Sequence, residues 1–195
     1  MNRFAAIALL VALPVAALAI VEPKTRTEYP DTVTMDVGGV PVTLVATGVG
    51  LREKTFMKVD VYTIVSYVAE GTDLGDAPYR VLRAADVPKR IQMDLRRGFS
   101  REKLVNSFRE VIEKNYADVS PFEADMNTLL GYFQRDAQDK DRIVFSYAPG
   151  VGLTTELNGE VMGLIDNPAM VEALWTVWFG EKPADKGLRA ELSGA

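Results

Sequence analysis

Two tight turns in the last third of the chain constrain its fold more than any other feature. They separate three short segments at 143–147, 152–157 and 160–165 that are typical of strands. The first turn contains Pro149-Gly150 and the second contains Asn158-Gly159. Asn-Gly favours the left-handed backbone of a two-residue hairpin turn. The pattern therefore predicts three short strands joined by turns.

Further strands are predicted in the first half of the chain. Val42 to Val45 begins one strand after a turn at Gly38-Gly39, and residues 55–68 predict a long strand rich in Val, Tyr and Ile. The apolar residues of this long strand do not alternate strictly, which indicates a bulge or burial of both faces. Residues 90–96 alternate apolar and polar side chains and predict a strand with one polar face.

Helices are predicted between and after these strands, from apolar spacing and from capping residues. They comprise a short helix at 78–85, a helix capped by Ser100, a helix capped by Ser120 with Pro121 at its first position, a helix capped by Asp166 or Asn167 that ends at Gly180, and a short helix after Pro183. The order of strands, two helices, strands and a helix predicts an α+β fold with helices against an antiparallel sheet.

The absence of histidine and cysteine limits the chemistry open to the chain. No Ser-His-Asp or Cys-His relay, no imidazole or thiolate zinc site and no disulfide can form. The acidic segment 136–141 lacks the central glycine and the terminal glutamate of a calcium loop, so we expect no metal. No phosphate-binding or dinucleotide-binding glycine motif is complete, and we expect no cofactor.

The charge balance also excludes one class of partner. The chain has 22 basic and 27 acidic residues, a formal charge of −5, which argues against a nucleic-acid-binding surface. At 48% hydrophobic residues, 195 residues can bury a substantial core in a single domain.

The first 19 residues have the features of a secretory signal peptide. Arg3 gives a positive start, Phe4 to Ala16 is apolar, and Ala17-Leu18-Ala19 is a small-x-small cleavage site. The apolar run is short for a membrane span and Pro14 interrupts it, so we expect cleavage after Ala19 rather than a retained anchor. A cysteine-free exported chain fits a bacterial periplasm. We therefore expect a periplasmic or secreted protein without a stable membrane span after cleavage.

Two distinctive stretches carry a family resemblance. They are GVGLREKTFMKVDVY at 48–62 and IDNPAMVEALWTVWFG at 165–180. Together they resemble the chalcone isomerase-like family, in a bacterial exported branch related to plant chalcone isomerases and to fatty-acid-binding proteins of the same fold. The resemblance implies an open-faced β-sandwich, with helices over one face of a large antiparallel sheet. Together with the signal peptide at 1–19, this resemblance predicts an N-terminal arm at 20–36 and a chalcone isomerase-like domain at 37–195.

The first of these stretches contains two candidates for a ligand site. Arg52 follows Gly48-Val-Gly50, whose glycines are expected to let the backbone turn tightly, and its guanidinium matches a carboxylate or phenolate. The resemblance implies that Arg52 is the family's pocket arginine and that Tyr62 holds the same anion, as in fatty-acid-binding members. The alternatives are an ion pair of Arg52 with a local acid such as Glu53, and a buried Tyr62 with one satisfied hydroxyl.

The groups that carry out the isomerase reaction in plant members are expected to be missing. The resemblance places a family threonine at Met57, a tyrosine near Leu104, an asparagine near Val111 and a second threonine at Val177. Each of these departures removes a hydrogen-bond donor that the reaction uses. A shift of one residue would restore the last donor at Thr176.

The remaining site residues are apolar. We expect Met57, Leu104 and Trp178 to line the pocket beside Arg52 and Tyr62, although core packing is the alternative for the late aromatic residues.

The expected function is binding of a small amphipathic carboxylate or phenolic ligand, a fatty acid first, without catalysis. One alternative is an intramolecular lyase (isomerase) that acts on chalcone-like enones. Another is a structural or interaction domain whose core is filled by its own side chains.

Overall fold

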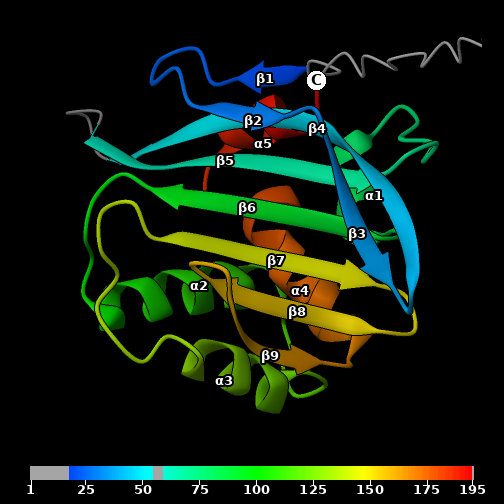
Figure 1. Ribbon diagram of the computed structural model, residues 1–195. Helices are drawn as coiled ribbons and strands as arrows, with labels where there is room; N and C mark the ends of the chain where they lie inside the picture. The colour runs from blue at the N-terminus through cyan, green and yellow to red at the C-terminus, as the bar shows by residue number, and fades with distance from the viewer. Residues whose placement is uncertain (1–17, 55–58, 195) are drawn as a thin grey trace, which may run out of the picture.

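The computed structural model describes residues 18–54 and 59–194. Its main element is a seven-stranded antiparallel sheet with the strand order β3-β4-β5-β6-β7-β8-β9 (Figure 1). The strands are β3 (Thr32–Val37), β4 (Val40–Lys54), β5 (Val59–Ala69), β6 (Lys89–Leu95), β7 (Arg142–Ala148), β8 (Gly152–Leu157) and β9 (Glu160–Ile165). Neighbours in the chain are thus neighbours in the sheet. A separate pair, β1 (Ala19–Val21) and β2 (Glu28–Pro30), lies beside this sheet.

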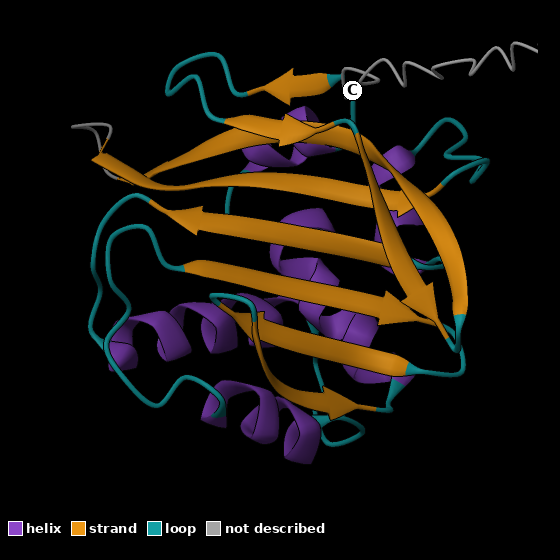
Figure 2. Cartoon of the chain, in the orientation of Figure 1, coloured by secondary structure: helices purple, strands orange, loops and turns teal. Residues whose placement is uncertain are grey.

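The helices cover one face of the large sheet (Figure 2). They are α1 (Pro78–Ala84), α2 (Arg101–Asn115), α3 (Glu123–Gly131), α4 (Pro168–Phe179) and α5 (Lys186–Leu192). This arrangement confirms the predicted α+β fold, a large antiparallel sheet with helices on one side. Within the described ranges, no helix is both long and apolar enough to cross a membrane.

The turn residues behave as their chemistry predicts. Gly38 and Gly39 join β3 to β4 with φ of 62° and 88°, and Asn158 and Gly159 join β8 to β9 with φ of 54° and 83°. Positive φ at both central residues is the requirement of the two-residue hairpin turn whose twist matches the flanking strands.

Two of the predicted helix caps are confirmed and one is wrong. The Ser100 hydroxyl accepts from the Lys103 amide, and the Asn167 side chain accepts from the Ala169 amide. Ser120 does not cap α3, which begins at Glu123. The Ser120 amide and hydroxyl instead donate to the Asp118 carboxylate, in a local turn before the helix.

Strand β5 shows both features that its irregular apolar pattern indicates. Tyr62, Ile64 and Val68 pack toward the helices, whereas Val65 and Tyr67 belong to a second cluster on the other face of the sheet. A bulge at the start of β5 falls where the register with β4 shifts between Arg52 and Glu53. The first four residues of the predicted strand, 55–58, lie outside the described residues.

The glycines before Arg52 do not form the tight turn that we expected. Gly48 and Gly50 lie inside β4, where α5 packs against the strand. A Cβ at Gly48 would overlap the Glu191 carbonyl oxygen and lie 2.8 Å from Leu192 Cα, and a Cβ at Gly50 would lie 2.5 Å from Leu188 Cδ1. These glycines therefore permit the close approach of a helix to a strand, and Arg52 projects from regular strand backbone.

Candidate functional site

A cavity of about 100 Å³ is lined by residues of the sheet and of the helices. These residues lie at the end of the sandwich where β4 and β6 end and α2 begins, and Figure 1 shows the positions of these elements. The cavity walls are mainly apolar. They include Met93 and Leu95 from β6, Leu104 and Phe108 from α2, and Val177 and Trp178 from α4. Arg52 and Tyr62 also line the cavity. Four of the five predicted site residues are thus brought together, whereas the fifth, Met57, lies outside the described residues.

Arg52 reaches the cavity from β4, directly opposite its register partner Tyr62 on β5. Its guanidinium carbon lies 6.0 Å from the centre of the Tyr62 ring, within the range of a cation–π contact. The local acid Glu53 pairs with Lys24 instead. Among the residues that the structure describes, none forms an ion pair with Arg52. An anion that enters the cavity would therefore meet an uncompensated guanidinium.

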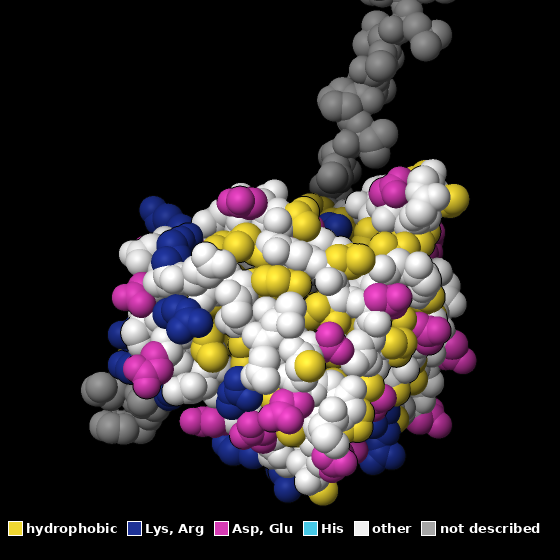
Figure 3. Space-filling view, turned by 90° about the horizontal axis from the view of Figure 1, so that it is seen from below, with side chains coloured by type: hydrophobic (Ala, Val, Ile, Leu, Met, Phe, Trp, Pro, Cys, Tyr) yellow, Lys and Arg dark blue, Asp and Glu magenta, His cyan; other side chains and the backbone are white. Residues whose placement is uncertain are grey.

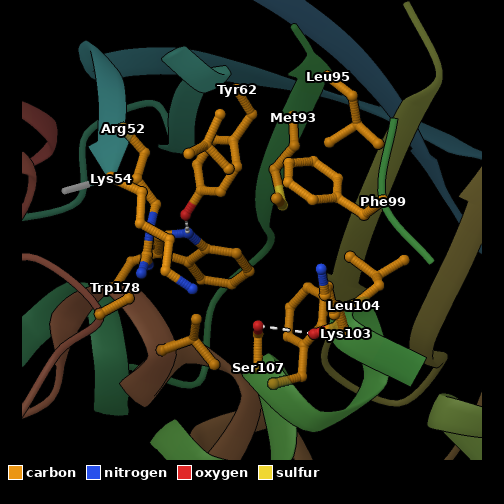
Figure 4. Close-up of a pocket in the computed structure, with 14 residues that line it drawn as sticks. Arg52, Lys54, Tyr62, Met93, Leu95, Phe99, Lys103, Leu104, Ser107 and Trp178 are labelled. Carbon is orange, nitrogen blue, oxygen red and sulfur yellow. Dashed lines mark hydrogen bonds between the residues drawn. The ribbon is translucent and has the colours of Figure 1, made fainter. Parts of the chain in front are cut away.

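Tyr62 is 6% exposed, and its hydroxyl accepts a hydrogen bond from the indole N–H of Trp178 at 3.2 Å (Figure 4). Burial raises the pKa of Tyr62, although Arg52 and the Trp178 hydrogen bond oppose that rise. The phenol is therefore protonated at neutral pH. Its oxygen is already an acceptor, so the hydroxyl proton can be donated to a ligand.

Two lysines that we did not single out from the sequence also line the cavity. Lys54 follows Arg52 on β4, and Lys103 comes from the first turn of α2. A cation in the first turn of a helix is unfavourable, because it opposes the helix dipole. This is the one feature of the sequence that distinguishes Lys103 from an ordinary surface lysine. Of the lining residues within 18–54 and 59–194, none is acidic, although acids outnumber bases in the chain.

The inner end of the cavity is closed by aromatic packing. The Phe108 ring meets Trp178 edge-on at 6.1 Å and Phe145 at 5.9 Å. Trp178 is therefore both a wall of the cavity and part of the core. Its neighbours Trp175 and Phe179 do not line the cavity, so for them the core interpretation holds.

The described positions at which the resemblance places the isomerase groups do not present donors to the cavity. Leu104 and Val177 line the cavity with apolar side chains, and Val111 packs against the main core instead. The Thr176 hydroxyl donates to the Ala173 carbonyl at 2.6 Å within α4. A shift of one residue therefore does not restore a donor in the cavity.

The structure offers no metal centre in the ranges that it covers. No group of three or more acidic side chains there is arranged to hold a metal ion. In the acidic segment 136–141, the Asp141 carboxylate pairs with Arg135 and accepts from the Asn158 amide. Arg135 holds the pKa of Asp141 down at about 2, with Asn158 and the Gln138 amide also lowering it. This segment is therefore a structural loop.

Comparison with known proteins agrees with the geometry. The model of the chalcone isomerase-like family matches residues 25–194. Among solved structures, a fatty-acid-binding protein of Arabidopsis thaliana matches with a TM-score of 0.70 and 20% identity, covering 90% of this chain and 96% of its own. A search of curated proteins gave no match.

Proposed function

The chain belongs to the chalcone isomerase-like family, and we propose that it binds a small amphipathic anion, a fatty acid first, without catalysing a reaction on it. One observation carries this proposal: the apolar cavity has Arg52 at its mouth, and no described residue neutralises that charge. A partly buried cation without an anion is costly, and a ligand head group would relieve that cost. The hydroxyl of Tyr62 supplies a second donor to the same head group.

The size of the cavity bears on the length of the ligand. Pockets that bury a drug-sized ligand usually enclose roughly 300–1,000 Å³, and this cavity encloses about 100 Å³. The acidic head and a short apolar tail fit this space, whereas a long acyl chain requires side chains at the inner end to move. The fold likeness to a protein named for fatty-acid binding supports an acyl ligand, and the volume favours the shorter acids.

The test is removal of the guanidinium. We expect Arg52→Ala to weaken binding of a short or medium-chain fatty acid by roughly 1.5–3 kcal/mol, about ten- to 150-fold, the range for a hydrogen bond to a charged group. Unfolding of the ligand-free protein should change little. Calorimetric titration, run beside thermal unfolding, separates the two effects.

The matched control is Arg142→Ala. Arg142 pairs with Asp94 and does not line the cavity, so its loss should leave fatty-acid affinity unchanged. The proposal fails if wild-type protein shows no saturable binding to any acyl chain from six to sixteen carbons. A filled interaction domain would then be the better interpretation.

Absence of catalysis is proposed from the chemistry of the cavity walls. Cyclisation of a chalcone needs donors that stabilise the developing enolate, and Leu104 and Val177 supply none where the plant enzymes are expected to have them. An ultraviolet assay with a 2′-hydroxychalcone should show no turnover above the spontaneous reaction. Clear turnover would make the intramolecular lyase the leading function.

Export is proposed from the first 19 residues. Intact-mass analysis of protein recovered from the periplasm or medium should give a chain that begins at Ile20. A full-length product retained in the membrane fraction would contradict signal cleavage.

A further inference from the structure

We propose that the head group this site selects is a dianion, specifically the phosphomonoester of a small apolar alcohol, rather than a monocarboxylate. The inference rests on the proposed function, because it concerns the ligand of the same cavity. It comes from the number and placement of the cations that line the cavity. Their total positive charge is larger than the single negative charge of one carboxylate.

The cations reach the cavity from two sides. Arg52 and Lys54 are two residues apart on β4, so both side chains point to the same face of the strand. Glu53, between them, points away and pairs with Lys24. Lys103 comes from α2, across the cavity from the two β4 residues (Figure 4). The alternation of the strand thus keeps the neighbouring acid out of the site while two cations face into it.

The charges do not balance with a monocarboxylate. Among the described residues, three cations and no acid line the cavity, and none of the three forms an ion pair. Asp185, next to the lining residue Ala184, is the acid whose charge reaches the site, since burial and this carboxylate both raise the pKa of Tyr62. The same carboxylate caps α5 by accepting from the Leu188 amide. A carboxylate would neutralise one charge of three, whereas a phosphomonoester carries about −1.5 to −2 at pH 7.

The shape of the head group agrees with the same choice. A carboxylate offers two oxygens in one plane, which suits a single guanidinium. A phosphomonoester offers three acceptor oxygens, which can meet Arg52 and Tyr62 on one side and Lys103 on the other. The Ser107 hydroxyl also lines the cavity, but it donates to the Lys103 carbonyl at 2.7 Å, so the additional donors are the lysines.

The wider surface supports approach of an anion to this end of the molecule. Figure 3 views the molecule from the side of α2 and α3, and Lys and Arg side chains, with some Asp and Glu among them, lie toward the end where α2 begins. Asp and Glu are more numerous toward the other end. In a chain with a formal charge of −5, such a separation steers anions toward the cavity and should weaken with added salt.

The experiment compares ligands with matched tails. Titrations at low salt and pH 7.5 would use hexanoate, hexyl phosphate, phenyl phosphate and inorganic phosphate. We expect hexyl phosphate to bind about tenfold more tightly than hexanoate, equivalent to about 1.4 kcal/mol. Lowering the pH to 5.5 should reduce this preference, because the second phosphate proton binds near pH 6. Comparison of phenyl phosphate with hexyl phosphate shows whether the cavity prefers an aryl or an alkyl tail on the same head group.

The variants are Lys103→Gln and, as a control on the same helix, Lys114→Gln. Lys114 is exposed in the last turn of α2, away from the cavity. We expect Lys103→Gln to reduce the preference for hexyl phosphate over hexanoate to about threefold or less, because an exposed cation contributes more to binding a head group with about two negative charges than to binding one with a single charge. Lys114→Gln should leave both affinities unchanged.

The outcomes separate the two proposals. If hexanoate binds and hexyl phosphate binds no better, the dianion inference is overturned and the proposed function stands. If inorganic phosphate binds as tightly as hexyl phosphate, the apolar cavity is not used and the inference is also overturned. If neither hexyl ligand binds, the dianion inference is overturned, and the proposed function then depends on the longer acyl chains in its own test.

Discussion

Two cations on this sheet, Lys89 and Arg52, lie against aromatic rings and have opposite surroundings. Lys89 on β6 is 2% exposed, and its amine lies 5.1 Å from the centre of the Trp175 ring. That amine donates to three backbone carbonyls, at Leu82, Arg83 and Ala85. For Arg52, the described residues supply no carboxylate, and its guanidinium lies against the Tyr62 ring. The protein itself solvates one cation and leaves the other for something outside the chain.

The carbonyls that hold Lys89 explain why it is structural. They belong to the last turn of α1 and the residue after it, where helix carbonyls have no partners within the helix. A cation there satisfies these carbonyls and complements the helix dipole. Arg52, in contrast, lies near the end of β4, at the register shift with β5, and not beside the free carbonyls of a helix end. A positive charge inside a protein therefore indicates a ligand site only after its internal acceptors have been counted.

Lys89→Met should give the largest effect. It removes the donor from three carbonyls but keeps most of the side-chain volume, so we expect a loss of about 3 kcal/mol in the free energy of unfolding. Fatty-acid affinity of the folded protein should not change. Urea unfolding measures the first quantity and calorimetric titration the second.

The control for this prediction is Lys114→Met, an exposed lysine near the end of α2, which should cost only a few tenths of a kcal/mol. Equal stability of the wild-type and Lys89→Met proteins would mean that water replaces the ammonium at α1, and the contrast with Arg52 would be lost.

The pH dependence of stability sharpens the same contrast with a somewhat smaller effect. Burial lowers the pKa of Lys89 from 10.5 to about 8, although Glu172 and Asp86 oppose the change. Between these two values the folded protein has released a proton that the unfolded chain still binds, so the free energy of unfolding rises with pH. We expect a gain of about 2 kcal/mol between pH 7.5 and 9.5.

Ionisation of buried tyrosines limits the pH range over which the free energy of unfolding rises. Burial raises the pKa of Tyr67, Tyr116 and Tyr147 to about 12, so their contribution to stability is lost only above pH 10. The rise below pH 9.5 therefore belongs to Lys89, and Lys89→Met should abolish it. A rise that persists in the variant would assign it to another group.

The sequence predicts the fold better than it predicts the surroundings of these cations. Hairpin turns such as Asn158-Gly159 and the cap at Asn167 follow from local backbone preferences, and they are confirmed. The role of Gly48 could not be read locally, because it depends on a helix far along the chain that packs against the strand. The long strand expected at 55–68 is described only from Val59.

The candidate site shows the same limit. The family resemblance places Arg52 and Tyr62 together, and the strand register does so as well. Lys54 and Lys103 resemble ordinary solvated lysines until the fold brings a strand end and a helix start to one cavity. Lys89 gave a usable signal, since it falls in phase with the buried residues of β6. A lysine at an apolar position of an alternating strand must find acceptors inside the protein.

The smallest expected effect comes from Arg52→Lys, which keeps the charge and removes the fork. An ammonium presents one point charge where the guanidinium offers paired N–H groups, so we expect binding of a fatty acid to weaken by about 0.5–1 kcal/mol, well short of the effect of Arg52→Ala. The free energy of unfolding should change little, because the variant keeps a positive charge beside the Tyr62 ring and no described residue forms an ion pair with Arg52.

Three results of Arg52→Lys would have different meanings. If the variant binds the fatty acid as tightly as the wild type, binding depends on the positive charge alone. If its affinity falls as far as that of Arg52→Ala, binding depends on the planar guanidinium and not on charge alone. A drop in melting temperature of the ligand-free protein would be the most damaging result. It would give Arg52 an internal partner, as Lys89 has, and would thereby remove the contrast from which a ligand at this cavity is inferred.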